Sequence, residues 1–118
     1  MGFFWWLPFG SVPEISVGAL AKAVKEKKGP LIVDVRSPSE FGSGHIQGAK
    51  SLSIGQLKGA LAAGEIPSGQ AIVAICLSAH RSIPAVRLLR ANGFENAVQL
   101  AGGMMAWKRA GMPVTTKR

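Results

Sequence analysis

The clearest structural signal in the sequence lies in residues 70–82, which read Gln70-Ala71-Ile72-Val73-Ala74-Ile75-Cys76-Leu77-Ser78-Ala79-His80-Arg81-Ser82. Its first part, residues 70–75, is a short apolar run of the kind found in strands that are covered on both faces of a sheet. A helix is predicted over residues 82–92, because Pro84 would lie in its permissive first turn and Gly93 would end it. Cys76 therefore lies between the end of a buried strand and the start of a helix.

Strands and helices alternate on both sides of this stretch. Helices are predicted after the N-cap residues Ser16 and Ser53, whereas residues 37–48 are rich in Ser, Gly and Pro and indicate a loop with one helical turn. The other predicted strands cover residues 13–16, 31–35, 49–52 and 97–100, and the other predicted helices cover residues 17–28, 54–63 and 103–110. This alternation predicts an α/β domain with a mainly parallel sheet and helices on both faces. Ligands of such sheets bind at the carboxyl ends of the strands, where Cys76 lies.

The composition is that of one globular domain. A chain of 118 residues with 47% hydrophobic and 17% charged residues is long enough to bury a core without disulfides or metals. We expect a single domain over residues 13–118, preceded by an N-terminal arm over residues 1–12. Cys76 is the only cysteine, so it cannot form an internal disulfide, and its thiol is either buried filler or a reactive group.

The residues after Cys76 favour the reactive alternative. A tight loop between a strand and a helix aims backbone N–H groups inward, and the helix adds the positive end of its dipole. This field and the nearby Arg81 guanidinium favour thiolate over thiol, so Cys76 is a candidate catalytic nucleophile. The Ser82 hydroxyl can either cap the helix or donate to sulfur. The candidate groups for binding an anion or a persulfide belong to Leu77, Ser78, Ala79, His80, Arg81 and Ser82.

Three blocks of sequence follow one another in a specific order. The first comprises Asp34-Val35-Arg36, Glu40-Phe41 and Gly44-His45-Ile46-Gln47-Gly48-Ala49, the second is the loop from Cys76 to Ser82, and the third is Leu100-Ala101-Gly102-Gly103 with Trp107. On these residues the chain resembles the rhodanese family, the sulfurtransferases that carry sulfur as a cysteine persulfide. The resemblance covers about residues 15–114, which is nearly everything except the arm.

The resemblance implies a rhodanese-like domain with a five-stranded parallel sheet, and a ping-pong reaction that needs no cofactor. The Cys76 thiolate would take the outer sulfur of an anionic donor such as thiosulfate, and a thiol, a dithiol or cyanide would then accept that sulfur from the persulfide. The acceptor thiol can belong to a small molecule or to a protein.

The resemblance also implies roles for residues around the loop. Arg81 would supply charge to the site or brace the loop through an acidic partner. Asp34 and Arg36 would support the loop from a neighbouring strand, with a structural ion pair as the alternative. Glu40 and His45 would order the upstream loop through hydrogen bonds.

The loop departs from the family pattern at three positions. Ala79 stands where Gly is frequent, so a backbone angle that Gly adopts freely would be strained here. Leu77 stands where many members that favour thiosulfate carry a basic residue, which weakens thiosulfate as the natural donor but leaves persulfide chemistry intact. His80 would add a positive charge that depends on pH.

Three other functions are compatible with parts of this sequence. Phosphatases and arsenate reductases of the related fold place Cys and Arg six positions apart, whereas Cys76 and Arg81 are 81 − 76 = 5 apart, which leaves less room for an oxyanion. One Cys with His45 and His80 falls short of a four-ligand zinc site, so no metal is expected. A rhodanese-like module that senses sulfur or binds a protein, without turnover of its own, is the alternative that stays open.

Charge and aromatic residues are both distributed unevenly. The chain has 14 Lys and Arg against 6 Asp and Glu, a net charge of +8, but these basic residues are scattered and carry no nucleic-acid motif, so we expect an anionic small molecule rather than nucleic acid. No apolar run could span a membrane, and we expect a cytoplasmic protein. The arm could fold onto its own domain, or it could contact a second chain or a membrane surface through Phe3, Phe4, Trp5, Trp6 and Phe9.

Overall fold

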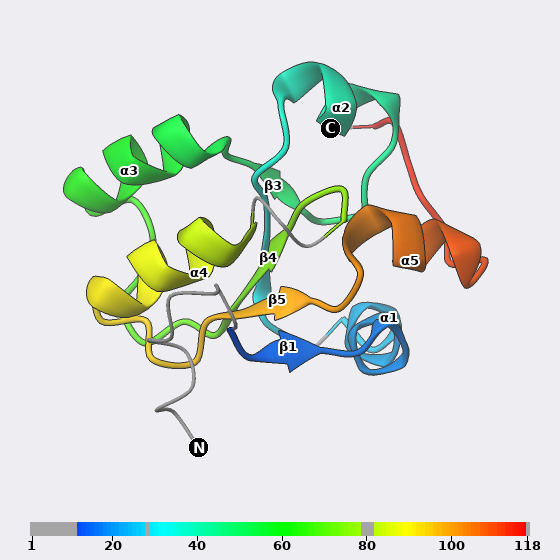
Figure 1. The fold of residues 1–118 in the computed structure, drawn as a ribbon, viewed down its shortest axis with the longest axis horizontal. Helices are drawn as coiled ribbons and strands as arrows, with labels where there is room; N and C mark the ends of the chain where they lie inside the picture. The colour runs from blue at the N-terminus through cyan, green and yellow to red at the C-terminus, as the bar shows by residue number, and fades with distance from the viewer. Residues whose placement is uncertain (1–11, 28, 79–81, 118) are drawn as a thin grey trace.

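A computed structural model of the chain describes residues 12–27, 29–78 and 82–117. Strands and helices alternate along these residues, as the sequence predicts (Figure 1). The elements are β1 (Glu14–Ile15), α1 (Val17–Lys25), β2 (Leu31–Asp34), α2 (Pro38–Ser43), β3 (Lys50–Ser51), α3 (Ile54–Ala62), β4 (Ile72–Ile75), α4 (Ser82–Ala91), β5 (Val98–Leu100) and α5 (Gly103–Arg109).

The strands form one five-stranded sheet in the order β1-β5-β4-β2-β3, and every pair of neighbouring strands is parallel. The predicted α/β class and the parallel sheet are therefore confirmed. β4 lies in the middle of the sheet, and all four of its residues are buried. Helices α3 and α4 lie on one side of the sheet, and α1 and α5 lie on the other (Figure 1).

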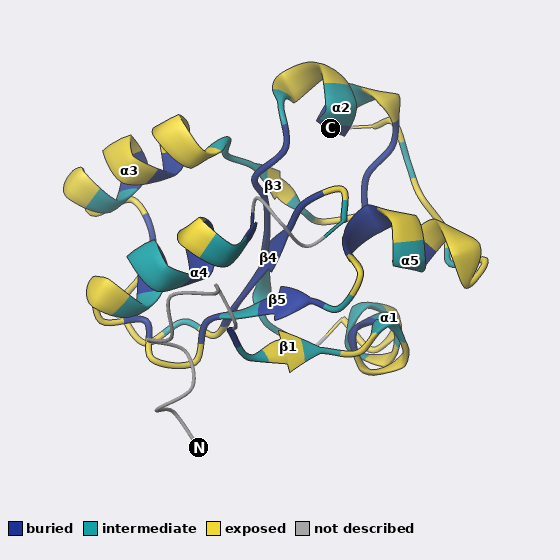
Figure 2. Cartoon of the chain, in the orientation of Figure 1, coloured by how far each residue is buried: buried dark blue, intermediate teal, exposed yellow. Residues whose placement is uncertain are grey.

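Each face of the sheet buries its own apolar core. Alternate residues of a strand point to opposite faces, so Ile72, Ala74 and Cys76 pack with α3 and α4, whereas Val73 and Ile75 pack with α1 and α5. Figure 2 shows β4 as part of the buried centre of the molecule. The side chain of Cys76 consequently starts from the face that carries α3 and α4.

The helix starts follow the capping residues that the sequence offers. Ser16 accepts a hydrogen bond from the Ala19 N–H and begins α1. Ser37 and Glu40 form a capping box, which extends the single helical turn expected in the loop to the six residues of α2. Helix α1 ends at Lys25, short of the predicted residue 28, because Lys27 adopts a left-handed φ of 55° that a helix cannot continue through.

The N-terminal arm, including its five aromatic residues, lies outside the described residues, so the contacts expected of it stay predictions. Within the ranges that the structure describes, none of the helices combines the length and the apolar character needed to cross a membrane.

Candidate active site

Cys76 follows β4 directly, at the carboxyl end of the central strand. Its side chain is only 1% exposed, and its Sγ lies 3.3 Å from the Oγ of Ser82, the first residue of α4. The predicted placement of Cys76 between a buried strand and a helix is thus correct. The sulfur lies beside the N-terminal end of α4, where the helix dipole favours negative charge.

The hydroxyl of Ser82 has a second partner that the sequence analysis did not identify. It donates a hydrogen bond of 2.6 Å to Oε1 of Gln99 on β5, the strand next to β4. The Nε2 of Gln99 in turn donates 2.8 Å to Oε2 of Glu14 on the edge strand β1. The only signal in the sequence is that Gln99 is a polar residue inside a predicted buried strand, which by itself does not reveal its partners.

Helix α5 holds the start of the Cys76 loop through its first backbone N–H groups. Met104 N–H donates 2.8 Å to the carbonyl oxygen of Cys76, and Met105 N–H donates 2.9 Å to that of Leu77. In a trans peptide the carbonyl and the next N–H point in opposite directions, so the N–H groups of Leu77 and Ser78 point away from α5. These two amides are thereby left free of α5 to face an anion on the other side of the loop.

Gly103 makes this close approach of α5 possible. A Cβ atom on Gly103 would lie 2.5 Å from the carbonyl oxygen of Cys76 and 2.7 Å from that of Leu77. Its φ of +63° is also in the left-handed region that glycine adopts without strain. The third block of the sequence resemblance therefore has a structural reason: its second glycine lets a helix touch the backbone of the cysteine loop.

Asp34 and Arg36 form an ion pair with each other. Both side chains are buried, and Nη2 of Arg36 lies 2.8 Å from Oδ2 of Asp34. The same nitrogen donates 2.8 Å to the carbonyl oxygen of Gly44, the residue after α2. The structural alternative for this pair is the one observed: it fixes the segment after β2 to the end of α2, and Asp34 balances the charge of Arg36.

Glu40 and His45 order the segment upstream of the site, in the way that the resemblance implies. The Glu40 carboxylate accepts from the backbone N–H of Ser37. The ring of His45 is buried, stacks on Phe41 at 3.7 Å, and lies 2.8 Å from the carbonyl oxygens of Phe41 and Lys117. His45 therefore joins α2 to the C-terminal segment.

Part of the predicted loop can be placed and part cannot. Leu77 is exposed, with 41% of the residue's surface accessible, and Ser78 is half-buried. Ala79, His80 and Arg81 lie outside the described residues, so their roles stay predictions. No three His, Cys, Asp or Glu side chains among the described residues gather in a way that would hold a metal ion.

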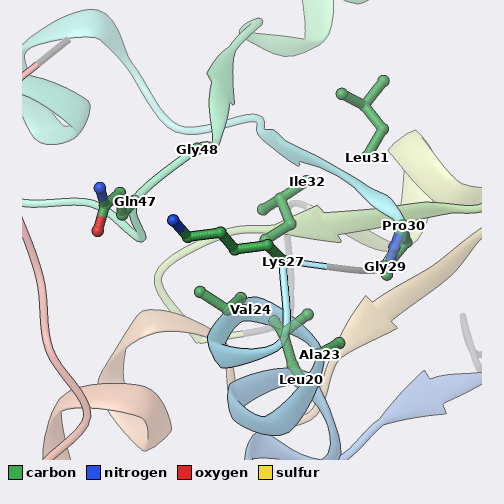
Figure 3. Close-up of a pocket in the computed structure, with 10 residues that line it drawn as sticks. All are labelled: Leu20, Ala23, Val24, Lys27, Gly29, Pro30, Leu31, Ile32, Gln47 and Gly48. Carbon is green, nitrogen blue, oxygen red and sulfur yellow. The ribbon is translucent and has the colours of Figure 1, made fainter.

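A cavity of about 340 Å³ lies at the opposite end of the sheet (Figure 3). It opens between α1 and the start of β2, next to Pro30 and Leu31, and the Lys27 side chain extends across it toward Gln47. Strands of a parallel sheet all begin at this end, whereas Cys76 follows the far end of β4. The cavity is therefore separate from the candidate active site.

Comparisons with known proteins agree with this geometry. The sequence model of the Rhodanese-like domain family matches residues 16–110. A sulfurtransferase from Allochromatium vinosum is 32% identical over 103 residues, which cover 87% of this chain and 94% of that protein. An uncharacterised protein from Synechocystis is 38% identical over 97 residues, which cover 80% of this chain.

The chain spans almost all of the Allochromatium relative but only 52% of the Synechocystis protein. A solved structure, that of a rhodanese-related protein from Thermoplasma volcanium, is similar with a TM-score of 0.78 and 27% sequence identity, over 89% of this chain and 99% of that one.

Proposed function

The chain belongs to the rhodanese-like domain family, and from that premise we propose that it moves a sulfane sulfur from a donor to an acceptor through a persulfide on Cys76. Sulfur transfer is the general activity that the family and the Allochromatium relative support. The observation that carries the finer proposal is the position of the Cys76 sulfur: it lies at the carboxyl end of the central strand, against the first turn of α4 and in a loop that α5 holds by its backbone.

In the first half-reaction the Cys76 thiolate attacks the outer sulfur of the donor. With thiosulfate, a new S–S bond forms at Cys76, the old S–S bond breaks, and sulfite leaves with the electron pair of that bond. The enzyme is left with a persulfide whose terminal sulfur carries a negative charge. The N–H groups of Leu77 and Ser78, which point away from α5, can donate hydrogen bonds to that sulfur.

In the second half-reaction an acceptor nucleophile attacks the terminal sulfur of the persulfide. Cyanide leaves as thiocyanate and a thiol leaves as its own persulfide, while the electron pair of the broken S–S bond returns to Cys76 as thiolate. We propose that the positive charge of Arg81 attracts the anionic donor. This role rests on the sequence resemblance. The acceptor in the cell is a thiol or dithiol, carried by a small molecule or a protein.

Leu77 bears on the choice of donor. Its exposed apolar side chain stands at the start of the loop, where it offers no charge to the sulfonate oxygens of thiosulfate. We therefore propose that a persulfide donor is used more efficiently than thiosulfate. The second candidate function, a module that carries or senses sulfur without turnover, shares the persulfide but has no fast acceptor step.

The test compares the purified chain with Cys76→Ser, using thiosulfate and a small-molecule persulfide as donors and cyanide and dithiothreitol as acceptors. We expect transfer by the wild type alone, and a mass increase of one sulfur atom on Cys76 after exposure to donor. Activity that survives in Cys76→Ser would remove Cys76 from the mechanism. A wild type that gains the sulfur but passes it to neither acceptor would favour the sensing module.

A further inference from the structure

A chain of hydrogen bonds links the Cys76 sulfur to the edge of the sheet through three side chains from three elements. It runs from Cys76 Sγ to Ser82 Oγ at 3.3 Å, then to Gln99 at 2.6 Å and to Glu14 at 2.8 Å. We propose that Gln99, oriented by Glu14, is a positioning residue that keeps the Ser82 proton away from the sulfur and so holds the resting Cys76 as a thiol. This inference rests on the proposed function in one respect: both take the thiolate of Cys76 as the reactive form.

Glu14 fixes the donor-to-acceptor direction of these hydrogen bonds. An ionised carboxylate only accepts hydrogen bonds, so it must face the NH₂ group of Gln99 and not its carbonyl oxygen. The opposite orientation of the amide would bring two acceptors together at 2.8 Å. Glu14 therefore turns Oε1 of Gln99 inward, toward Ser82.

Gln99 then decides where the proton of Ser82 points. A carbonyl oxygen only accepts, so the single hydroxyl proton of Ser82 is committed to Oε1 of Gln99 in the short bond of 2.6 Å. Ser82 can offer Cys76 only a lone pair, and the partner that suits a lone pair is the S–H group of a thiol. This arrangement stabilises the thiol and gives no donor to a thiolate.

The side chains that form these hydrogen bonds next to the sulfur are shielded from water. Cys76, Ser82 and Gln99 are 1%, 0% and 4% exposed, so bulk water cannot replace a missing partner. When the sulfur becomes an anion, the Ser82 hydroxyl can donate to it only by rotating away from Gln99, which leaves Oε1 without that donor. Gln99 thus opposes the helix dipole and the loop amides, which favour the anion.

Among the residues that the structure describes, the other charged side chains near β4 have partners other than the sulfur. At the end of β2, Asp34 and Arg36 bind each other. Arg87 and Arg90 lie farther along α4, and the guanidinium of Arg90 donates to the carbonyl of Ala97. Glu14 is linked to the sulfur through Gln99 and Ser82.

Two variants should release the Ser82 proton. In Gln99→Met the side chain keeps its length but accepts hydrogen bonds only weakly, so the hydroxyl can donate to sulfur. In Glu14→Gln the Gln99 amide is free to turn its NH₂ group inward, and Ser82 can then accept from Gln99 while it donates to Cys76. Glu14 is exposed, so this second variant leaves the core intact if Gln99→Met fails to fold.

The experiment measures alkylation of Cys76 by iodoacetamide, an uncharged reagent, as a function of pH. We expect both variants to react roughly 2- to 10-fold faster at neutral pH, the factor that one hydrogen bond is worth, with the midpoint of the profile moved to lower pH. Glu65→Gln, the same change at an exposed site after α3, should react as the wild type does. In a Ser82→Ala background, Glu14→Gln should have no effect.

Unchanged or slower alkylation in Glu14→Gln would overturn the proposal, because a purely structural role predicts no gain. A gain that persists in the Ser82→Ala background would also overturn it, because the described hydrogen bonds join Gln99 to the sulfur through Ser82. Alkylation needs no sulfur donor or acceptor. Even if the protein had no sulfurtransferase activity, the variants would still show the expected faster alkylation. Failure of the proposed function and failure of this inference can therefore be told apart.

Discussion

Replacing Gly103 by Ala is the most direct way to test how α5 holds the cysteine loop. The added Cβ would lie 2.5 Å from the carbonyl oxygen of Cys76, a separation at which one of the two backbones must shift. We expect the shift to lengthen the hydrogen bonds from Met104 and Met105 to the loop carbonyls, because both donors lie in the turn that would be displaced.

The expected loss of stability follows from three contributions. An alanine at a φ of +63° is strained by about 1–2 kcal/mol. Losing the hydrogen bonds from Met104 and Met105 removes about 1 kcal/mol each. Gly103→Ala should therefore lower the free energy of unfolding by about 3–4 kcal/mol, a large share of the roughly 5–15 kcal/mol that stabilises an ordinary domain.

Gly111→Ala is the matched control. Gly111 lies two residues after the end of α5 and has a φ of +77°, but a Cβ there would meet nothing within 4 Å. It should lose only the backbone contribution, about 1–2 kcal/mol. Urea unfolding of both variants measures the difference, and alkylation of Cys76 reports whether the loop has moved. Equal losses in the two variants, with unchanged alkylation, would refute the inference that α5 and the loop touch through Gly103.

Three further predictions concern residues around the site. Asp34→Asn should lower the free energy of unfolding by about 3–5 kcal/mol because it leaves the buried Arg36 charge without its partner, and Asp34→Leu combined with Arg36→Met should regain part of that loss in the same urea titration. His45→Ala should lower the free energy of unfolding by about 2–4 kcal/mol, because it removes two hydrogen bonds and the stacking on Phe41. The alkylation rate of Cys76 should stay unchanged, and a changed rate would place His45 in the site. Leu77→Lys should lower the KM for thiosulfate and leave that for a persulfide donor nearly unchanged, because it adds a positive charge at an exposed position of the loop; equal effects on both donors would contradict this explanation of donor choice.

The local features of the fold were predictable because they depend on neighbours in the chain. The apolar run before Cys76 specifies a buried strand, and Ser16 starts α1 because its side chain bonds an N–H three residues away. The length of α2 was underestimated, although its capping box is also local: Ser37 and Glu40 are three residues apart and both bonds of the box form. A stretch rich in Ser, Gly and Pro indicates a loop more strongly than a single capping box indicates a helix.

The candidate site also has features that the sequence predicts and features that only the structure shows. Cys76 and the helix that follows it are close in sequence, so the candidate nucleophile, its place at the end of a strand and the direction of the helix dipole could all be predicted locally. The resemblance supplied the pair of Asp34 and Arg36 but left its role open, and the structure resolves it as an ion pair because the guanidinium bonds both Asp34 and Gly44.

The surroundings of the sulfur depend on how distant strands and helices pack together. Glu14 and Gln99 are 85 positions apart, and they meet because the strand order places β1 beside β5 and β5 beside β4. The contact of Gly103 with the cysteine loop likewise needs α5 to return to the carboxyl end of β4. Hydrogen bonds of this kind depend on which strands become neighbours, and the local periodicity of a sequence specifies strands without specifying their order.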